Sequence, residues 1–154
     1  MRHLIRVPVS TVVSLTAEAS VELMTGILKA ESNYAKLNPA VITISSRLTI
    51  ADGGIDAEIN APHDAQIPAD CFFAAGLTGI QLKSGTSFKP WTNGSIRSEL
   101  ISSKGTLFPE VERLIERRGR YVVVCTGHDL TPQQRNNACE QIVRVLESVG
   151  VDWL

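Results

Sequence analysis

The sequence predicts a mixed α/β domain with a central sheet between helices. Residues 39–45 are mostly β-branched and alternate in polarity, which is typical of a strand. Residues 120–127 are nearly all apolar, as in a strand covered on both faces. Amphipathic segments at 17–31 and 130–150 predict helices on either side of these strands. The predicted order is helix, three strands, helix, strand and helix, and this order favours a sheet packed between helices.

The first half of the chain supplies the first helix and two strands. The helix at 17–31 has an apolar stripe formed by Val21, Met24, Ile27 and Leu28. The strand at 39–45 follows it. Residues 51–62 begin with a glycine turn and continue as a second strand, whose side chains alternate between two faces.

The second half begins with a long hairpin loop at 60–77 and a third strand at 77–85. Residues 86–106 are rich in Ser, Thr, Gly, Asn and Lys, which predicts a loop with a short helix at 95–101. A helix at 108–119 precedes the apolar strand at 120–127. In the last helix Thr131 and Gln134 form a capping box, Pro132 suits the first turn, and the apolar stripe is Cys139, Ile142, Val143, Leu146 and Val149.

Composition limits the class of protein. The 154 residues suffice for about one domain, which we assign to 1–154 with a core at 17–150. Apolar residues make up 44% of the chain and charged residues 20%, as expected of a globular protein. The formal net charge of -1 gives no basic footprint for the whole chain, although Lys and Arg recur in the second half. The end "ESVGVDWL" fits an N-terminal module of a longer protein as well as a natural terminus.

Cysteine usage and hydropathy predict a cytoplasmic protein. The three cysteines are widely spaced and form no CxxC, which argues against a disulfide framework or a zinc site. The first residues lack the pattern of a signal peptide. No run approaches the ~18 apolar residues that span a membrane. We therefore expect reduced thiols and no membrane segment.

Polar residues interrupt two of the middle strands. Asp56 has apolar neighbours on both sides, and Gln81 and Lys83 alternate with apolar residues. Each strand thus has one apolar face and one polar face. If the two strands are neighbours, an acid, an amide oxygen and an ammonium group share one patch of the sheet.

This patch has the chemistry of a magnesium site. Hard cations take oxygen ligands, usually one or two carboxylates with several waters. Asp56 offers its carboxylate, Gln81 its side-chain carbonyl and Leu82 its backbone carbonyl. Lys83 would lie beside the metal-bound water, where it can orient or deprotonate that water or stabilise charge on a phosphate. Glu58 shares the face of Asp56 and is either an accessory acid or a solvated side chain.

The stretches "DGGID" (52–56) and "IQLK" (80–83) resemble the active-site signature of the PD-(D/E)xK nuclease superfamily. They are most similar to Mrr-like restriction endonucleases, in which Gln often replaces the Glu of the second element. The resemblance implies a restriction-endonuclease-like three-layer αβα fold with a mixed central sheet. It also implies that Asp56, Gln81 and Lys83 are catalytic. Many members add a glutamate from the first helix, which we match to Glu22, with Glu18 and Glu31 as competitors.

The same resemblance implies a function. The expected activity is a DNA endonuclease that uses Mg²⁺ or Mn²⁺ to hydrolyse phosphodiester bonds, as the effector of a bacterial antiphage or restriction system. Expected partners are DNA and either further copies of the chain or a fused regulatory NTPase or sensor domain. The residues that would bind DNA are not indicated by the sequence.

Other interpretations stay open. A nuclease-fold module with an acid lost to Gln81 could bind DNA or a partner without cutting it. A junction resolvase would share the fold and the signature. In the plainest interpretation, Gln81 and Lys83 lie on an exposed strand face. A cysteine hydrolase built on Cys125 and His128 is disfavoured, because buried cysteines are usually inert and no base is placed by the sequence.

Overall fold

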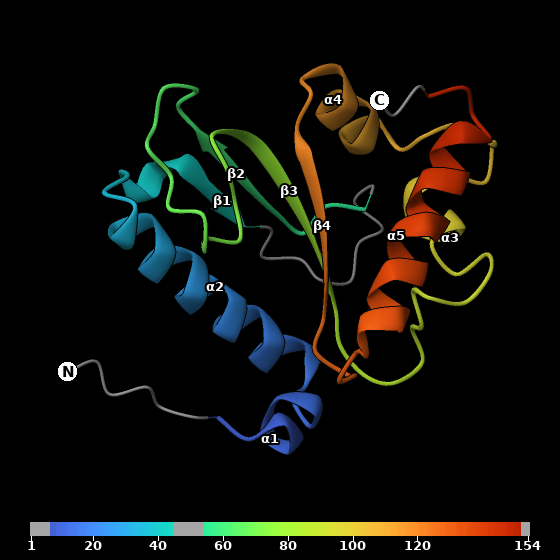
Figure 1. The fold of residues 1–154 in the computed structure, drawn as a ribbon, viewed down its shortest axis with the longest axis horizontal. Helices are drawn as coiled ribbons and strands as arrows, with labels where there is room; N and C mark the ends of the chain where they lie inside the picture. The colour runs from blue at the N-terminus through green and yellow to red at the C-terminus, as the bar shows by residue number, and fades with distance from the viewer. Residues whose placement is uncertain (1–6, 45–53, 152–154) are drawn as a thin grey trace.

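The computed structural model describes residues 7–44 and 54–151, which form a mixed α/β structure with a four-stranded sheet (Figure 1). The strands lie in the order β1-β2-β3-β4. The first three strands pair antiparallel, and β4 pairs parallel to β3. Their bounds are β1 Ile42–Ile44, β2 Ala57–Ala61, β3 Gly76–Lys83 and β4 Arg120–Cys125.

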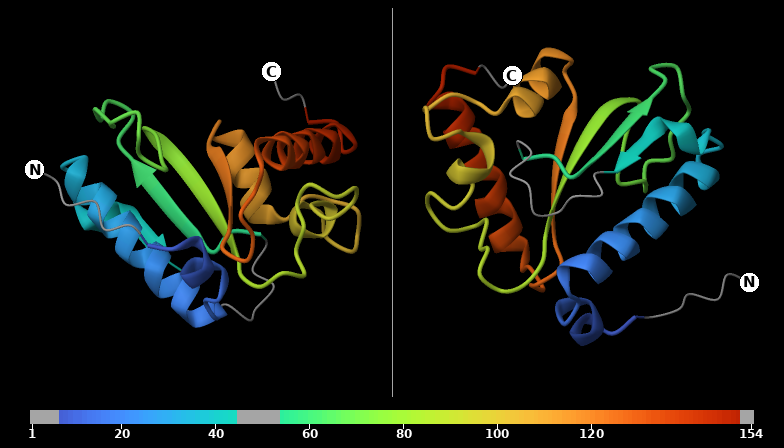
Figure 2. Two further views of the ribbon diagram at one scale, coloured as in Figure 1. Left: turned by 60° about the horizontal axis from the view of Figure 1, so that its bottom comes forward. Right: turned by 180° about the vertical axis from the view of Figure 1, so that it is seen from behind.

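Helices lie on both faces of this sheet, as the left panel of Figure 2 shows. The helix α2 covers one face, whereas α3, α4 and α5 lie on the other. Because β3 and β4 are parallel, the chain must cross over between them, and α3 and α4 form that crossover. The bounds are α1 Val9–Val13, α2 Ala17–Tyr34, η1 Pro39–Val41, α3 Arg97–Leu100, α4 Pro109–Glu116 and α5 Pro132–Glu147.

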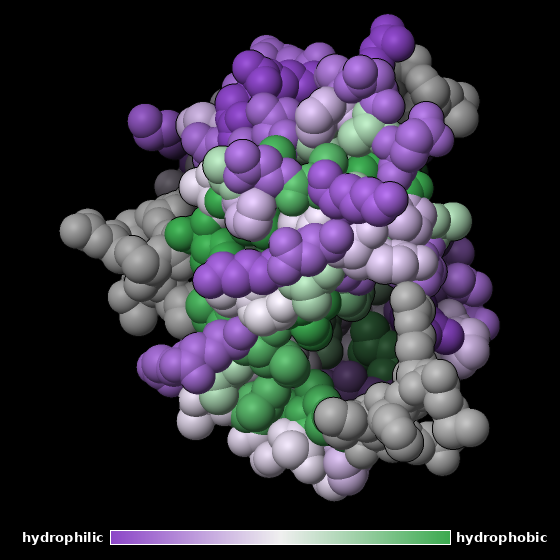
Figure 3. Space-filling view, turned by 90° about the vertical axis from the view of Figure 1, so that its left-hand side faces the viewer, coloured by the Kyte–Doolittle hydropathy of each residue, from purple (hydrophilic) through white to green (hydrophobic). Residues whose placement is uncertain are grey.

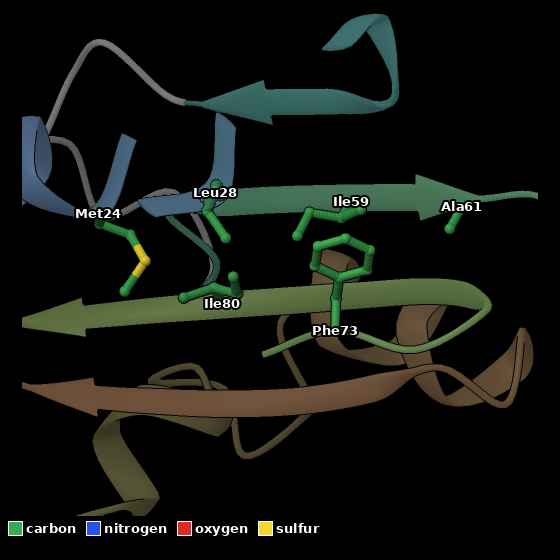
Figure 4. Close-up of a cluster of buried hydrophobic side chains, with 7 residues drawn as sticks. Met24, Leu28, Ile59, Ala61, Phe73 and Ile80 are labelled. Atoms are coloured by element: carbon green, nitrogen blue, oxygen red, sulfur yellow. The ribbon is translucent and has the colours of Figure 1, made fainter. Parts of the chain in front are cut away.

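The core beneath α2 joins the helix to the two central strands (Figure 4). Met24 and Leu28 from α2 pack against Ile59 of β2 and Ile80 of β3. Phe73, which is 1% exposed, enters this core from the loop between β2 and β3. The predicted stripe at Met24 and Leu28 is thus confirmed, and the long loop contributes to the core as well as joining the strands.

A second core lies on the opposite face of the sheet. Its buried members come from α3, α4 and α5 and the segments around them, and they are Ile96, Leu100, Ile101, Val111, Val145 and Leu146. Tyr121 of β4 packs against this cluster with its ring. The two faces of the sheet are therefore filled by separate sets of side chains, as expected for a three-layer arrangement.

The local signals for the last helix are confirmed at its start. Thr131 accepts a hydrogen bond from the Gln134 backbone, and the Gln134 side chain accepts one from the Thr131 backbone. The predicted stripe of this helix is wrong at Cys139, which is exposed, whereas Gln141 and Val145 are buried. Leu146, Ile142 and Val149 of the predicted stripe do pack in the second core, so the prediction is confirmed at these positions.

Two strand boundaries also differ from the predicted ones. Residues 39–41 form a 3₁₀ turn, and β1 begins at Ile42, because Asn38 caps the turn and Pro39 starts it. Described strand pairing in the second strand begins at Ala57, and the predicted start at 51–53 lies outside the described residues. β4 is half-buried rather than covered on both faces, because it is the last strand of the described sheet.

The ends of β3 and β4 are held together by a close backbone approach. The amide of Thr126 donates a hydrogen bond to the Lys83 carbonyl over 2.9 Å. A Cβ atom at Gly127 would lie 1.7 Å from the Gly85 carbonyl oxygen, so only glycine fits there. The Thr126 and Ser20 hydroxyls lie 3.0 Å apart, which ties the start of α2 to the same corner.

Figure 3 shows the side of the molecule that carries α2, where long hydrophilic side chains lie across apolar surface. None of the helices in residues 7–44 and 54–151 combines the length and the apolar character needed to cross a membrane.

Candidate active site

The end of β3 places its side chains on alternate faces of the sheet. Ile80 is fully buried and packs in the core under α2, with Leu82 packed against the same core. Gln81 and Lys83 therefore point to the opposite face, where both contact Glu99 of α3. Gln81 is buried and Lys83 is half-buried, so the pair does not lie on an open strand face.

Asp56 is fixed to β3 by two hydrogen bonds. It directly precedes β2, and its amide donates to the Ile80 carbonyl over 2.8 Å. Its Oδ2 atom accepts a hydrogen bond from the Leu82 amide over 2.6 Å. The N–H and C=O of one strand residue point to the same edge, so the Leu82 carbonyl also lies on the side of Asp56. The structure thus brings the predicted acid to the residue between Gln81 and Lys83.

Gln81 is 3% exposed and its amide is bonded at both ends. Its Oε1 atom accepts a hydrogen bond from the Tyr121 hydroxyl over 2.6 Å, and its Nε2 atom donates to Glu99 Oε2 over 2.6 Å. The carbonyl that we expected to face a metal is therefore directed at Tyr121. Gln81 joins two neighbours from different elements.

Lys83 forms an ion pair with Glu99, with 2.7 Å between Nζ and Oε2. Its ammonium also lies 5.5 Å from the centre of the Phe88 ring. The Lys83 side chain is 30% exposed, so the ammonium can still meet a ligand from solvent. Its carboxylate partner comes from a helix and not from the neighbouring strand.

Glu99 is the residue that the sequence analysis missed. It is the sole acid between Asp70 and Glu110, in a stretch that holds several cations, and this isolation was the available signal. Its position is set by close packing, because a Cβ atom at Gly54 would lie 2.3 Å from the Glu99 carbonyl oxygen. Gly54 has a φ of 81°, which also favours glycine.

Tyr121 connects these groups from β4. Its hydroxyl lies 3.3 Å from the Gly54 carbonyl, in addition to its bond with Gln81. Burial raises the pKa of Tyr121 well above its usual range, and the negative charges of Glu99 and Asp56 raise it further. The phenol thus stays protonated as a donor, and both carboxylates act on it.

The glutamates considered on the first helix are not brought to this cluster. Glu22 is exposed. It is two residues from Ser20 and two from Met24, and two residues correspond to a rotation of about 200° around a helix axis. Glu22 therefore lies on the side of α2 opposite these two buried residues. Glu18 is exposed as well. Glu31 accepts a hydrogen bond from the Phe72 amide over 2.8 Å, far along α2.

A small cavity against Asp56 shows what α2 presents there instead. It is lined from α2 by Val21, Met24 and Thr25, none of which is an acid. The expectation that Glu22 reaches the site is therefore not supported by the placement of this helix.

Glu58 forms an ion pair with Arg113 of α4, which also binds Glu110 over 2.8 Å. These side chains line an open cavity of about 360 Å³ that also borders Asp56. Hydrogen bonds to Glu58 and Glu110 raise the pKa of Arg113 further above its already high value. Glu58 thus holds an arginine at the rim of the candidate site.

The cysteine alternative receives no support from the structure. Burial raises the pKa of Cys125 to about 11, although the charge of Lys83 lowers it slightly. The ring of His128 contacts Trp91, with 4.9 Å between ring centres. Cys125 is therefore a protonated packing residue at neutral pH.

Within residues 7–44 and 54–151, no three or more His, Cys, Asp or Glu side chains converge as a metal-binding group. The oxygen donors near the end of β3 are two carboxylates, Asp56 and Glu99, and the Leu82 carbonyl. One or two carboxylates with backbone oxygens and waters suit Mg²⁺. Comparison with known proteins finds no matching family model, no matching curated protein and no matching solved structure.

Proposed function

We propose that the protein is a metal-dependent endodeoxyribonuclease of the PD-(D/E)xK type. The observation that carries the proposal is the hydrogen bond from the Leu82 amide to Asp56, since Leu82 lies between Gln81 and Lys83. This places an acid that can hold a divalent metal next to a lysine that can stabilise charge on a phosphate.

The arrangement of helices and strands also supports the proposed nuclease function. The antiparallel β1-β2-β3 unit, the parallel β4 and the helices on both faces are compatible with a restriction-endonuclease-like αβα domain. The proposed site lies where β3 leaves the sheet, next to the crossover that leads to β4. Side chains from β3, α3 and β4 can therefore meet there.

Asp56 and the Leu82 carbonyl would hold Mg²⁺ or Mn²⁺ at this edge. A bound ion of this kind activates water and neutralises negative charge on a phosphate. Lys83 is held by Glu99 with its ammonium partly exposed, and from there it can donate to a phosphate oxygen. Asp56 keeps its orientation through the Leu82 amide, so no rearrangement of β3 is needed.

DNA is the proposed substrate because two exposed cations lie on the segments that bring Phe88 and Glu99 to Lys83. Lys89 follows Phe88, which lies against Lys83, and Arg97 begins the helix that carries Glu99. Both are exposed. Neutralising phosphates with such residues supplies most non-specific affinity for DNA. We place the activity in a bacterial antiphage or restriction system, with a homo-oligomer or a fused NTPase as its regulatory context.

The test is cleavage of supercoiled plasmid in Mg²⁺ by wild-type protein and by Lys83→Ala. Removing one charged donor from a phosphate site lowers turnover by about 100-fold or more. Lys29→Ala, which alters an exposed lysine of α2, is the matched control and should cleave like wild type. Wild-type rates from Lys83→Ala would remove Lys83 from the mechanism.

A second candidate is a module that binds DNA or a partner without cutting. It is favoured by the Gln81 amide, whose two ends are already bonded to Tyr121 and Glu99. Titration with Mg²⁺ or Mn²⁺ separates the two candidates, because only the nuclease requires a metal that stabilises the fold.

A further inference from the structure

We propose that Glu99 supplies the second carboxylate of the metal site and that Gln81 is the positioning residue that holds it. This inference rests on the proposed nuclease function and names a residue outside the signature. It also assigns Gln81 the role of holding Glu99, so that Gln81 is not merely a replacement for a lost acid.

The hydrogen bonds of Glu99 leave one oxygen available. Its Oε2 atom receives both the Gln81 amide, at 2.6 Å, and the Lys83 ammonium, at 2.7 Å. In the part of the chain that the structure describes, no group donates a hydrogen bond to Oε1. The Glu99 side chain is 19% exposed, so it is partly buried. The carboxylate is thus anchored at Oε2, while Oε1 has no hydrogen-bond donor among the described residues.

Independent contacts bring Glu99 to the segment that carries Asp56. The Glu99 carbonyl packs against Gly54, two residues before Asp56, more closely than any side chain would allow. The Gly54 carbonyl in turn lies 3.3 Å from the Tyr121 hydroxyl, which donates to Gln81. Gln81 is joined to Glu99, and its neighbour Leu82 is joined to Asp56. The two acids therefore approach the end of β3 from α3 and from the start of β2.

This geometry explains why residue 81 is a glutamine. An acid at this position would place a second carboxylate oxygen about as near to Glu99 as the amide nitrogen now is, at 2.6 Å. Two carboxylates so close cannot both ionise readily, and one would have to hold a proton. An amide of the same length instead donates a hydrogen bond to Glu99 while accepting one from Tyr121. A glutamine at position 81 is therefore compatible with an ionised Glu99 on α3, whereas a glutamate is not.

The experiment measures binding of Mn²⁺ by titration calorimetry to the full chain, with circular dichroism as a check on folding. The variants are Asp56→Asn, Glu99→Gln, Gln81→Glu and the exchange variant that combines Gln81→Glu with Glu99→Gln. Glu22→Gln, on the exposed face of α2, is the matched control. Glu99→Gln should weaken binding by about 10-fold or more, as should Asp56→Asn. The exchange variant should recover most of the loss, because it restores one acid and one amide.

The outcomes are distinct. If Gln81→Glu alone binds Mn²⁺ more tightly than wild type, residue 81 is a degenerate acid and the inference is wrong. If Asp56→Asn loses binding but Glu99→Gln does not, the inference is wrong while the proposed function stands. If wild type itself binds no metal, the proposed function fails and the inference fails with it.

Discussion

Replacing Gln81 with leucine should destabilise the protein well beyond an ordinary conservative change. Leucine is close in size to glutamine and suits a side chain that is 3% exposed, so the packing is largely kept. The change removes the hydrogen bond to Tyr121 and the one to the charged Glu99. A neutral hydrogen bond contributes about 1 kcal/mol and one to a charged group about 1.5–3 kcal/mol. The expected loss in the free energy of unfolding is therefore roughly 2–4 kcal/mol.

Urea unfolding followed by circular dichroism measures this loss. For a domain of this size, each kcal/mol lowers the midpoint of thermal unfolding by roughly 2–4 °C, so the midpoint should fall by about 10 °C. Tyr121→Phe is the matched variant, since it removes only the phenol hydroxyl and should cost about 1 kcal/mol.

The double variant Gln81→Leu with Tyr121→Phe should cost less than the sum of the two single changes, because both remove the same hydrogen bond. Strict additivity, or a loss below about 0.5 kcal/mol for Gln81→Leu, would refute the view that this amide joins β3 to β4 and α3.

Two further predictions concern the corner around the site. Gly127→Ala should cost more than about 4 kcal/mol or prevent folding, because its Cβ would lie 1.7 Å from the Gly85 carbonyl oxygen. Gly26→Ala should instead stabilise α2 by about 0.5–1 kcal/mol, since nothing lies within 4 Å of the added atom. Equal effects of the two changes on the free energy of unfolding in urea would contradict the view that close backbone packing requires glycine at 127. Cys125, whose pKa is raised to about 11, should react slowly with a thiol reagent at pH 8, whereas exposed Cys139 should react fast. Because the folded state holds the Cys125 proton more tightly than the unfolded state, this thiol stabilises the fold below its unfolded pKa. That contribution should fall as the pH rises through about 11. The free energy of unfolding of wild type, minus that of Cys125→Ser, should therefore decrease over this range. An increase would contradict the direction of the pKa shift.

Features of the fold that depend on a few neighbouring residues could be predicted from the sequence. The capping box at Thr131 and the alternation along 80–83 are both present in the structure. The order of helices and strands was also predictable, because strand and helix periodicities differ in kind. The mixed sheet was implied only by the family resemblance, and the pairing of the strands confirms it. Asp56 could be brought near Gln81 only by assuming that the two strands are neighbours, which the pairing of Ala57 with Ile80 now shows.

Glu99 could not be found in this way. The helix that carries it has 4 residues, too few for a helical period to be visible. Its approach to Gln81 depends on the packing of Gly54 against the Glu99 backbone, across more than forty residues of chain. Glu22 was placed at the site for a different reason. It was matched from the family resemblance, whereas the stripe at Met24 and Leu28, which the structure confirms, leaves Glu22 on the exposed side of α2.

The most direct test of the account is the rate at which supercoiled plasmid is cleaved in Mg²⁺ by wild type and by Asp56→Asn. Asparagine keeps an oxygen that can accept the Leu82 amide, so the fold should survive while the negative charge is lost. The account predicts metal-dependent cleavage by wild type and a loss of about 100-fold or more in the variant. Equal cleavage by the two proteins, or cleavage that persists after chelation of the metal, would contradict it.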